Sequence, residues 1–143
     1  MAEFLSELQI MAPLSHPNLV QLIGGSWENP DELCIVLELC VEGSLSTYLG
    51  KIPRTWTEVR CVLAVGAARG LRYLHHELPA PLIHRDIKPD NILVGDDIVA
   101  KLADFGVSTR FDTELAQSEL DAGGDADVLT MTMMVGTELY CKS

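Results

Sequence analysis

The chain has few basic residues, with 10 Lys and Arg against 21 Asp and Glu in 143 residues and a formal net charge of −11. Phosphate backbones and anionic lipid repel so acidic a protein, so nucleic-acid and membrane-surface partners are disfavoured. The longest stretch made only of apolar residues and glycine, residues 61–68, is much too short to span a bilayer. Because no basic, apolar leader follows Met1, we expect an intracellular protein.

Patterns typical of zinc sites and of disulfide frameworks are missing as well. None of the cysteines forms a C-x2-C pair, and no histidine stands at zinc-like spacing from them. Because their sequence neighbours are apolar, we predict buried free thiols in a reducing compartment. The four cysteines are Cys34, Cys40, Cys61 and Cys141.

Periodic apolar residues predict two helices. One pattern covers residues 4–14, and a longer one covers residues 59–74, behind a capping box at residues 55–58. The longer pattern forms one apolar stripe and predicts a long core helix. In this helix Gly66 and Gly70 predict close packing in a soluble core, because arginines interrupt the segment and disfavour pairing in a membrane.

Four apolar runs of strand length predict two antiparallel hairpins. The first joins residues 19–23 to residues 33–39 across a turn-rich stretch, and the second joins residues 92–94 to residues 99–102. Between the hairpins, residues 43–49 predict a short helical turn. Strands and helices therefore mix along the chain.

The acidic residues are concentrated towards the end of the chain. Residues 111–141 hold seven Asp and Glu and no Lys or Arg, together with a Gly-Gly pair. A stretch with this charge bias and few large apolar groups cannot form a core of its own. We therefore predict that residues 107–135 form a mobile, solvated segment.

The chemistry-bearing residues stand on either side of the second hairpin. Residues 84–91 read HRDIKPDN, and residues 104–106 read DFG. A loop of this kind can hold two carboxylates, an ammonium group and a carboxamide around one cavity. Hard oxygen ligands beside a cation suit Mg²⁺ and a polyphosphate, whereas zinc is disfavoured because His84 is the only imidazole among them.

The two motifs, in this order, match the protein kinase signature H-R-D-x-x-x-x-N followed by D-F-G, so the sequence resembles the eukaryotic protein kinase family. The Lys-Pro pair at 88–89 resembles the Ser/Thr branch, and Trp27 with the stretch 34–38 is similar to tyrosine-kinase-like Ser/Thr kinases. The resemblance implies an α+β, two-lobed kinase-like fold, present here in part. Residues 1–38 would be a remnant of the small lobe, and residues 39–143 the first part of the large lobe.

The resemblance assigns roles to four polar residues and implies ATP and Mg²⁺ as cofactors and protein hydroxyls as substrates. Asp86 would orient the substrate hydroxyl and accept its proton, and Lys88 would neutralise the transferring phosphoryl group. Asn91 and Asp104 would hold Mg²⁺. Outside such a block Lys88 would read as a surface lysine.

Further residues would bind the nucleotide. Glu7 matches the small-lobe glutamate that pairs with the family's third-strand lysine, although a lone Glu is more often a solvated helix residue. Leu37 would be the gatekeeper beside the adenine, and the backbone from Glu38 to Cys40 would be the hinge that meets the adenine edge. Leu93 would lie under the ring.

Four residues would stack as the regulatory spine that couples the first helix to the Asp-Phe-Gly turn. Independently of the family, we expect Met11, Leu22 and Leu37 in the core. The four spine residues are Met11, Leu22, His84 and Phe105.

Several parts of the family's domain are not in this sequence. It contains no G-x-G-x-x-G and no lysine strand of the V-A-I-K type, and residues 141–143 stand where A-P-E begins in the family. We therefore expect a truncated gene product with little activity by itself. Two classes stay open, a Ser/Thr kinase that is active when complete and a non-catalytic, kinase-like binding module; a small-molecule phosphotransferase is a distant third. The flanking sequence distinguishes the first two.

Two threonines in the acidic segment are candidates for phosphorylation by an upstream kinase. Thr130 and Thr132 stand just before residues 135–137, where the family carries activating phosphates. A phosphate there could pair with Arg85, which precedes the catalytic aspartate. Unmodified linker residues are the alternative.

Overall fold

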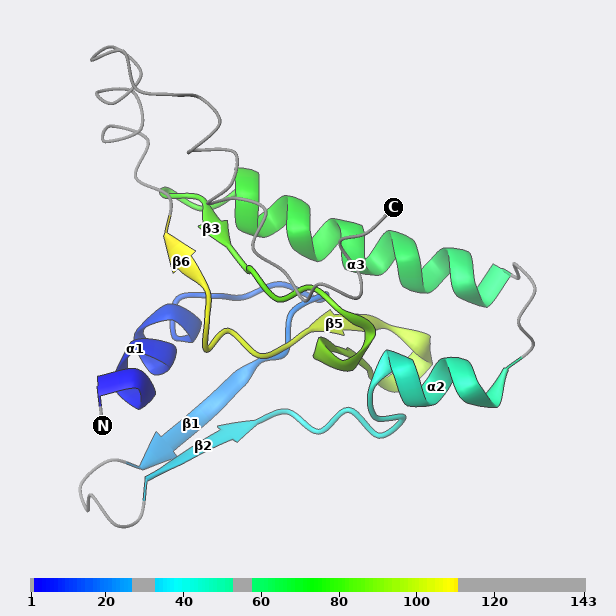
Figure 1. Cartoon of the computed structure of the whole chain (residues 1–143), viewed down its shortest axis with the longest axis horizontal. Coiled ribbons are helices and arrows are strands. Elements are labelled where there is room, and N and C mark those ends of the chain that lie inside the picture. Colours follow the sequence, from blue (N-terminus) through cyan, green and yellow to red (C-terminus); the bar gives the residue numbers. More distant parts are fainter. Residues whose placement is uncertain (1, 27–32, 53–57, 111–143) are drawn as a thin grey trace.

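The structure, a computed structural model, describes residues 2–26, 33–52 and 58–110 (Figure 1). Several sequence predictions concern residues outside these ranges, and the structure says nothing of them. They are Trp27, Cys141, Thr130, Thr132, most of the capping box at 55–58, and the acidic segment from residue 111 onward.

Within the described ranges, three α-helices and six short strands mix along the chain, as the sequence predicts. The elements in chain order are α1 (Ala2–Met11), β1 (Leu22–Ser26), β2 (Cys34–Leu37), α2 (Leu45–Lys51), α3 (Glu58–His76), β3 (Leu82–Ile83), η1 (Pro89–Asn91), β4 (Ile92–Val94), η2 (Asp96–Ile98), β5 (Ala100–Leu102) and β6 (Thr109–Arg110). In Figure 1, α1 and the β1–β2 hairpin lie on the left, and α2 lies on the right with most of α3. The stretch between β2 and α2 crosses from one side to the other.

The helix ends follow local chemistry. α1 ends at Met11 rather than at the predicted Leu14, because Pro13 disfavours a helical conformation in the residue before it. α2 begins after Ser44, whose hydroxyl accepts a hydrogen bond from the Thr47 amide at 3.3 Å. α3 ends at His76, as predicted.

The first hairpin is present but lies later in the chain than predicted. β1 and β2 are antiparallel, with Leu22 opposite Leu37 and Ser26 opposite Cys34. The strand begins at Leu22 because the residues before it bond elsewhere. Val20 donates to the Leu102 carbonyl at 2.9 Å, and Leu102 donates to the Asn18 carbonyl at 2.9 Å. The predicted run 19–23 is therefore divided between two pairings.

The second hairpin is confirmed, and α3 packs on it. β4 and β5 are antiparallel, with Leu93 opposite Lys101. A Cβ on Gly70 would stand 2.7 Å from the Asn18 carbonyl oxygen, and one on Gly66 would stand 3.2 Å from the Ala100 Cβ. The two glycines therefore let α3 approach the strand, as the sequence predicts.

One buried cluster joins both sides of the molecule. It contains side chains from α1, α3, β3, β4 and β5, with Phe105 fully buried among them. Its members are Met11, Leu14, Leu19, Leu63, Leu74, Leu82, Ile92, Val94, Ala100, Leu102 and Phe105.

Several predictions of burial are wrong. Cys34 and Cys61 are exposed, and only Cys40 of the three described cysteines is buried. Cys61 lies two residues before the buried Leu63, so it projects from the opposite face of α3. Leu37 is 38% exposed, because β2 pairs with β1 and with no other described strand. Val62, predicted in the apolar stripe of α3, is also exposed.

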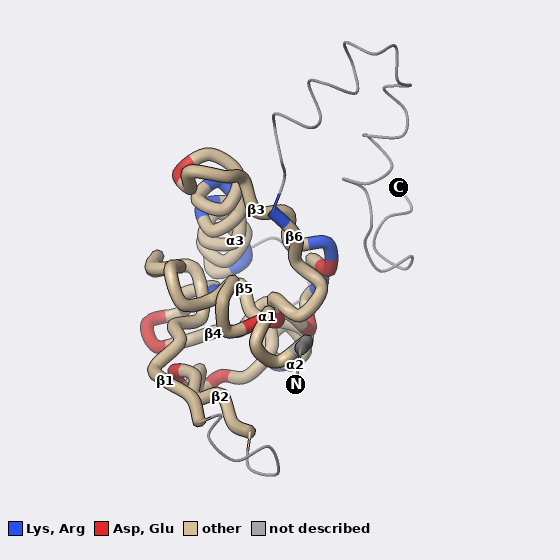
Figure 2. The backbone as a smooth tube through the Cα atoms, turned by 90° about the vertical axis from the view of Figure 1, so that its left-hand side faces the viewer, with Lys and Arg blue, Asp and Glu red and all other residues tan. Residues whose placement is uncertain are grey.

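Basic residues lie along α3 outside its buried apolar face. Figure 2 shows Lys and Arg positions gathered on this helix, which carries Arg60, Arg69 and Arg72. Among the helices that the structure describes, none is long and apolar enough to cross a bilayer.

Candidate active site

The pairing of two short strands brings the predicted motifs together. β3 runs antiparallel to β6, with Ile83 opposite Thr109. The hydroxyl of Ser108 donates to the His84 carbonyl at 3.2 Å. β3, which precedes residues 84–91, and β6, which follows residues 104–106, therefore lie side by side (Figure 1). Residues 108–110, the start of the segment predicted to be mobile, are tied to β3 by this pairing.

Asp86 is the centre of a compact polar cluster. Its Oδ2 accepts hydrogen bonds from the Lys88 ammonium at 2.6 Å and from the Asn91 amide at 2.8 Å. The Asn91 amide also donates to the Asp86 carbonyl at 3.0 Å. Because Asn91 is buried and closes both bonds from its Nδ2, its side chain holds the aspartate and leaves its own Oδ1 for another partner. Three of the predicted catalytic residues are thus in one cluster.

The lysine of this cluster stays protonated. Its hydrogen bond to Asp86 is the largest influence and raises the pKa of Lys88 above the ordinary value. Desolvation opposes this rise, and the negative charges of Asp86, Asp104 and Asp90 add to it. The influence of Asp104 places this second carboxylate in the same electrostatic neighbourhood. An ammonium group that bonds one carboxylate and is influenced by a second suits a site that must hold phosphate oxygens.

His84 anchors the loop to the segment before Asp104. Its buried ring bonds the Ala103 carbonyl through Nε2 at 2.9 Å, and the Asp86 amide donates to its Nδ1 at 3.4 Å. Burial lowers the pKa of His84, so the ring is neutral and donates through Nε2. Its ring centroid lies 5.1 Å from that of Phe105. His84 is therefore a structural residue that sets the spacing between the two motifs.

Two residues of the motifs have unusual backbone conformations. Arg85 has φ 70° and Asp104 has φ 64°. Positive φ is uncommon outside glycine, and such residues are concentrated at functional sites, where the surrounding contacts offset the strain. Phe105, buried in the core, provides such a contact next to Asp104, whose own side chain is exposed.

The carboxyl group of Glu7 interacts electrostatically with Asp104. Partial burial raises the pKa of Glu7, and the negative charge of Asp104 raises it further. No described Lys or Arg forms an ion pair with Glu7. The predicted spine residues lie in the same region: Met11 and Phe105 are in the buried core, and Leu22 packs against it.

Two of the predicted adenine-binding residues, Cys40 and Leu93, meet in a second, smaller cluster. Cys40 is buried with Val20 and Ala103, and Leu93 packs against these three. The Gly43 amide donates to the Cys40 carbonyl at 3.1 Å. The structure therefore brings Leu93 to the hinge residue Cys40, with Ala103, the residue before Asp104, beside them.

Glu38 makes contacts that the sequence analysis missed. Its Oε1 accepts a hydrogen bond from the Gln21 amide at 2.7 Å and pairs with the Lys101 ammonium at 3.0 Å. The Glu38 amide in turn donates to the Gln21 carbonyl at 3.0 Å. A lone lysine within the apolar run 99–102 was the signal that could have indicated a buried partner for Lys101.

The donor set suits a metal that is also held by its substrate. No described residues form a group of three or more His, Cys, Asp or Glu that could hold a metal ion by themselves. The Asn91 Oδ1 and the Asp104 carboxylate are oxygen donors, and Mg²⁺ commonly uses one or two such ligands with phosphate oxygens completing its shell. The residues present therefore fit Mg²⁺ bound together with a nucleotide.

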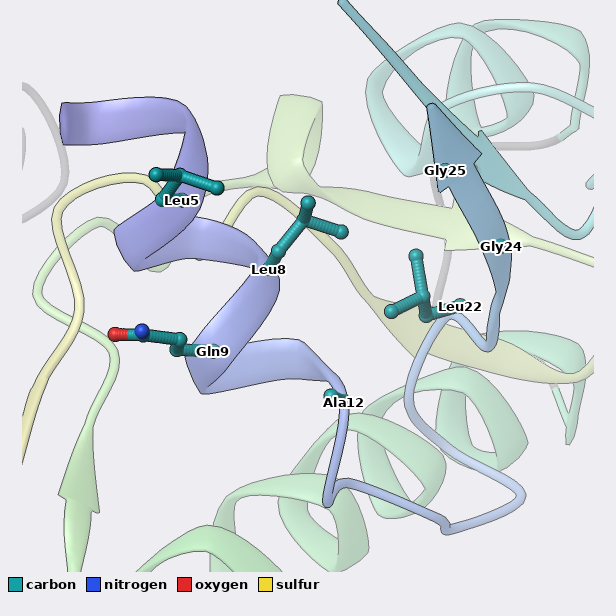
Figure 3. Close-up of a pocket in the computed structure, with 7 residues that line it drawn as sticks. All are labelled: Leu5, Leu8, Gln9, Ala12, Leu22, Gly24 and Gly25. Atoms are coloured by element: carbon teal, nitrogen blue, oxygen red, sulfur yellow. The ribbon is translucent and has the colours of Figure 1, made fainter. Parts of the chain in front are cut away.

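An apolar cavity of about 470 Å³ lies elsewhere, between α1 and β1. Figure 3 shows Leu5 and Leu8 on the helix and Ala12 just after its end, opposite Leu22, Gly24 and Gly25 on the strand. The Gln9 side chain, which also lines the cavity, points away from the strand. None of the residues predicted to bind ATP lines it.

Comparison with known proteins identifies the family. The model of the protein kinase domain matches residues 1–142. The probable serine/threonine-protein kinase PBL5 of Arabidopsis thaliana is 39% identical over 144 residues, covering 97% of this chain and 31% of that protein. The L-type lectin-domain containing receptor kinase IX.1 of the same plant is 41% identical over 123 residues, covering 85% and 19%. The G-type lectin S-receptor-like serine/threonine-protein kinase LECRK4 of Oryza sativa subsp. indica is 41% identical over 116 residues, covering 81% and 14%.

The fold and the clustered motifs are those of a protein kinase, and the chain belongs to the protein kinase domain family. Its relatives are named serine/threonine-protein kinases, and these 143 residues form part of a eukaryotic kinase domain of that type. The chain spans less than a third of the length of the three relatives above.

Proposed function

We propose that the protein transfers the γ-phosphoryl group of ATP to serine or threonine hydroxyls of protein substrates. The observation that carries the proposal is the Asp86 cluster. One carboxylate is held by Lys88 and Asn91, and a second carboxylate, Asp104, acts on the same lysine. Phosphoryl transfer requires mainly positioning and charge neutralisation, which this arrangement supplies.

The residues divide the reaction between them. The Asp86 carboxylate accepts the proton of the attacking hydroxyl and orients its oxygen towards the phosphorus. The Lys88 ammonium, which bonds Asp86, neutralises negative charge on the phosphoryl group during its transfer. Asn91 and Asp104 would hold Mg²⁺, which when bound neutralises the phosphate oxygens and draws them into line.

The other end of the site would bind the adenine. The backbone from Glu38 to Cys40 supplies hydrogen-bonding groups, and Leu93 forms an apolar floor beside Cys40. Leu37 stands where β2 ends, next to this backbone, and would limit the depth of the adenine site. In this proposal residues 1–38 belong to the small lobe and residues 39–143 to the large lobe, with the nucleotide between them. Glu7 would take its cation from the phosphate-binding lysine of the complete domain.

A regulatory partner is also part of the proposal. Arg85 has a buried Nε that forms no hydrogen bond within the described part of the chain. A phosphate added by an upstream kinase to Thr130 or Thr132 would supply an anion for this guanidinium. The proposal for the two threonines rests on sequence alone.

The test uses the full-length protein, meaning the natural polypeptide that contains these residues. Its wild type, incubated with γ-labelled ATP, Mg²⁺ and a generic protein substrate, should label serine or threonine. Asp86→Asn should lower this turnover by about 10²–10⁴-fold, because it removes the proton acceptor.

Asp96→Asn is the matched control, because Asp96 is an exposed carboxylate on η2 that no described side chain bonds. It should keep wild-type turnover. A wild-type protein that labels no substrate, or an Asp86→Asn variant as active as Asp96→Asn, would contradict the proposed function and favour a non-catalytic module.

A further inference from the structure

We propose that Lys101 is a positioning residue for ATP, because its ion pair with Glu38 holds the adenine-binding hinge, residues 38–40, at a set place relative to Asp104. The inference rests on the proposed function and adds a residue to it. Lys101 bonds the side chain of Glu38, so it would act on the adenine site through that residue.

The position of the pair in the chain is the first argument. Glu38 is the first hinge residue after β2, and Lys101 lies on β5 three residues before Asp104. The Nζ to Oε1 contact of 3.0 Å therefore links the element that carries the adenine contacts directly to the element that leads to the metal-binding carboxylate. These two elements must meet opposite ends of one nucleotide.

The hydrogen bonds around Glu38 are the second argument. The same Oε1 accepts the Gln21 amide at 2.7 Å, and the Glu38 amide donates to the Gln21 carbonyl at 3.0 Å. Glu38 is thus held on both its side chain and its backbone. Gln21 immediately follows Val20, whose amide donates to the Leu102 carbonyl on β5. Glu38 is therefore linked to β5 twice, directly through Lys101 and indirectly through Gln21 and Val20.

Burial is the third argument. The side chains of Lys101 and Glu38 are 17% and 27% exposed, whereas those of Lys51 and Glu42, a 3.4 Å pair on the surface, are 55% and 43% exposed. Exposed ion pairs contribute little, whereas a shielded, charge-assisted pair with further hydrogen bonds is held more rigidly. The neighbouring Cys40 thiol senses both partners, since Glu38 raises its pKa and Lys101 lowers it, although burial is the larger cause of its raised pKa. The pair therefore stands beside the adenine site.

The experiment measures ATP affinity in the full-length protein with a fluorescent ATP analogue, and steady-state kinetics alongside. Lys101→Met should raise the Kd of the analogue and the KM for ATP about tenfold, equivalent to about 1.4 kcal/mol. The value of kcat and the KM for the protein substrate should stay within about twofold, because the hinge binds ATP equally before and during transfer.

A double-mutant cycle separates positioning from general support. Glu38→Gln keeps an acceptor for the Gln21 amide but loses the charge, so it should weaken nucleotide binding as Lys101→Met does. The double variant should be no worse than the worse single one. Lys101→Arg, which keeps the charge, should stay within about twofold of wild type, and so should the surface control Lys51→Met.

Three results would overturn the inference: a Kd within twofold of wild type in Glu38→Gln, additive effects in the double variant, or the same loss in Lys51→Met. If Lys101→Met does not fold, Glu38→Gln decides alone. The outcome is separable from the proposed function, because nucleotide binding is measured without phosphoryl transfer. An Asp86→Asn variant with wild-type activity would contradict the proposed function, whatever the Kd of the ATP analogue in the Lys101 and Glu38 variants.

Discussion

The catalytic loop of the proposed function, residues 84–91, and the β1–β2 hairpin both belong to the proposed nucleotide site but are held in different ways. In the catalytic loop, His84, Asp86 and Asn91 are fixed by hydrogen bonds to one another and to Ala103. In the hairpin, the strands pair with each other, while apolar side chains face outward. These exposed residues are Ile23 (66%), Val36 (46%) and Leu37 (38%).

The difference shows what each region needs. In the loop, the side chains of His84, Asp86 and Asn91 have hydrogen-bond partners within the described chain, whereas the buried Arg85 Nε has none there. The hairpin is a two-stranded sheet in the described structure, and such a sheet is marginal until another surface covers its apolar side. We therefore expect substitutions to have large effects in the first region and small ones in the second.

The largest effect should follow Asn91→Ala in the full-length protein. The change removes the two hydrogen bonds that the Asn91 amide donates to Asp86 and one of the two oxygen donors proposed for Mg²⁺. Turnover should fall about 10²–10³-fold, as for other groups that stabilise charge in the transition state. Steady-state kinetics at several Mg²⁺ concentrations checks this, and a fall of less than tenfold at all of them would break the link between Asn91 and the site.

The next effect compares two leucines on the two sides. Leu102→Ala removes a fully buried side chain beneath α3 and should lower the free energy of unfolding by about 2–5 kcal/mol. Leu39→Ala, at a position 83% exposed after β2, should change it by less than about 0.5 kcal/mol. Urea unfolding of the full-length variants measures both, and equal losses would remove the contrast between the regions.

A smaller effect tests the contact between α3 and β5. Gly70→Ala places a Cβ 2.7 Å from a backbone carbonyl and should cost about 1–3 kcal/mol of stability. Gly50→Ala is the matched control on α2, where nothing stands within 4 Å of the new Cβ. It should be neutral or stabilising by up to about 1 kcal/mol, since alanine favours a helix. Thermal unfolding of both variants checks the pair, and a neutral Gly70→Ala would mean that the helix does not approach so closely.

The smallest effect is a pH dependence at His16, which stacks on Tyr73 of α3. Burial lowers the pKa of His16 below 6.5. The negative charge of Glu77 partly opposes this shift, and the positive charges of Arg72 and Lys101 add to it. The unfolded chain then binds the proton more readily, so stability is full above pH 6.5 and falls as the pH drops below it. His16→Gln, which retains an acceptor for the Asn18 amide, should flatten this slope. Urea midpoints between pH 7.5 and 5.5 measure it, and parallel slopes would exclude His16 as a cause.

Motif spacing predicted the catalytic loop well because its geometry is local. Residues 84–91 carry both partners of the hydrogen bonds that Asp86 makes with His84, Lys88 and Asn91, so the order of residues was sufficient to predict this cluster. The two hairpins and the long helix also followed from periodicity. Strand bounds in the first hairpin did not, because the pairing of residues 18–20 with Leu102 depends on residues more than eighty positions apart.

The burial of individual side chains was harder to predict than the secondary structure. Leu37 and Cys34 are apolar or weakly polar in an apolar run, yet what covers a strand is decided by its neighbours in space rather than in sequence. Lys101 shows the converse, since its partner Glu38 is 63 residues away and no local pattern joins them. The predicted roles of Glu7, Leu37, Glu38, Cys40 and Leu93 towards ATP stay predictions.

The most direct test of this account is amide hydrogen exchange of the full-length protein, without nucleotide and with Mg²⁺ and ATP. The central claim is that the phosphoryl-transfer side of the site is assembled before the nucleotide binds. The amides of Asn91, Leu102 and Ala103, which donate to the Lys88, Asn18 and Asn91 carbonyls, should exchange slowly in both states. The amides of hinge residues 39–40 should exchange fast and slow down only with ATP. Fast exchange at Asn91 and Ala103 that ATP slows as much as it slows the hinge would contradict the claim.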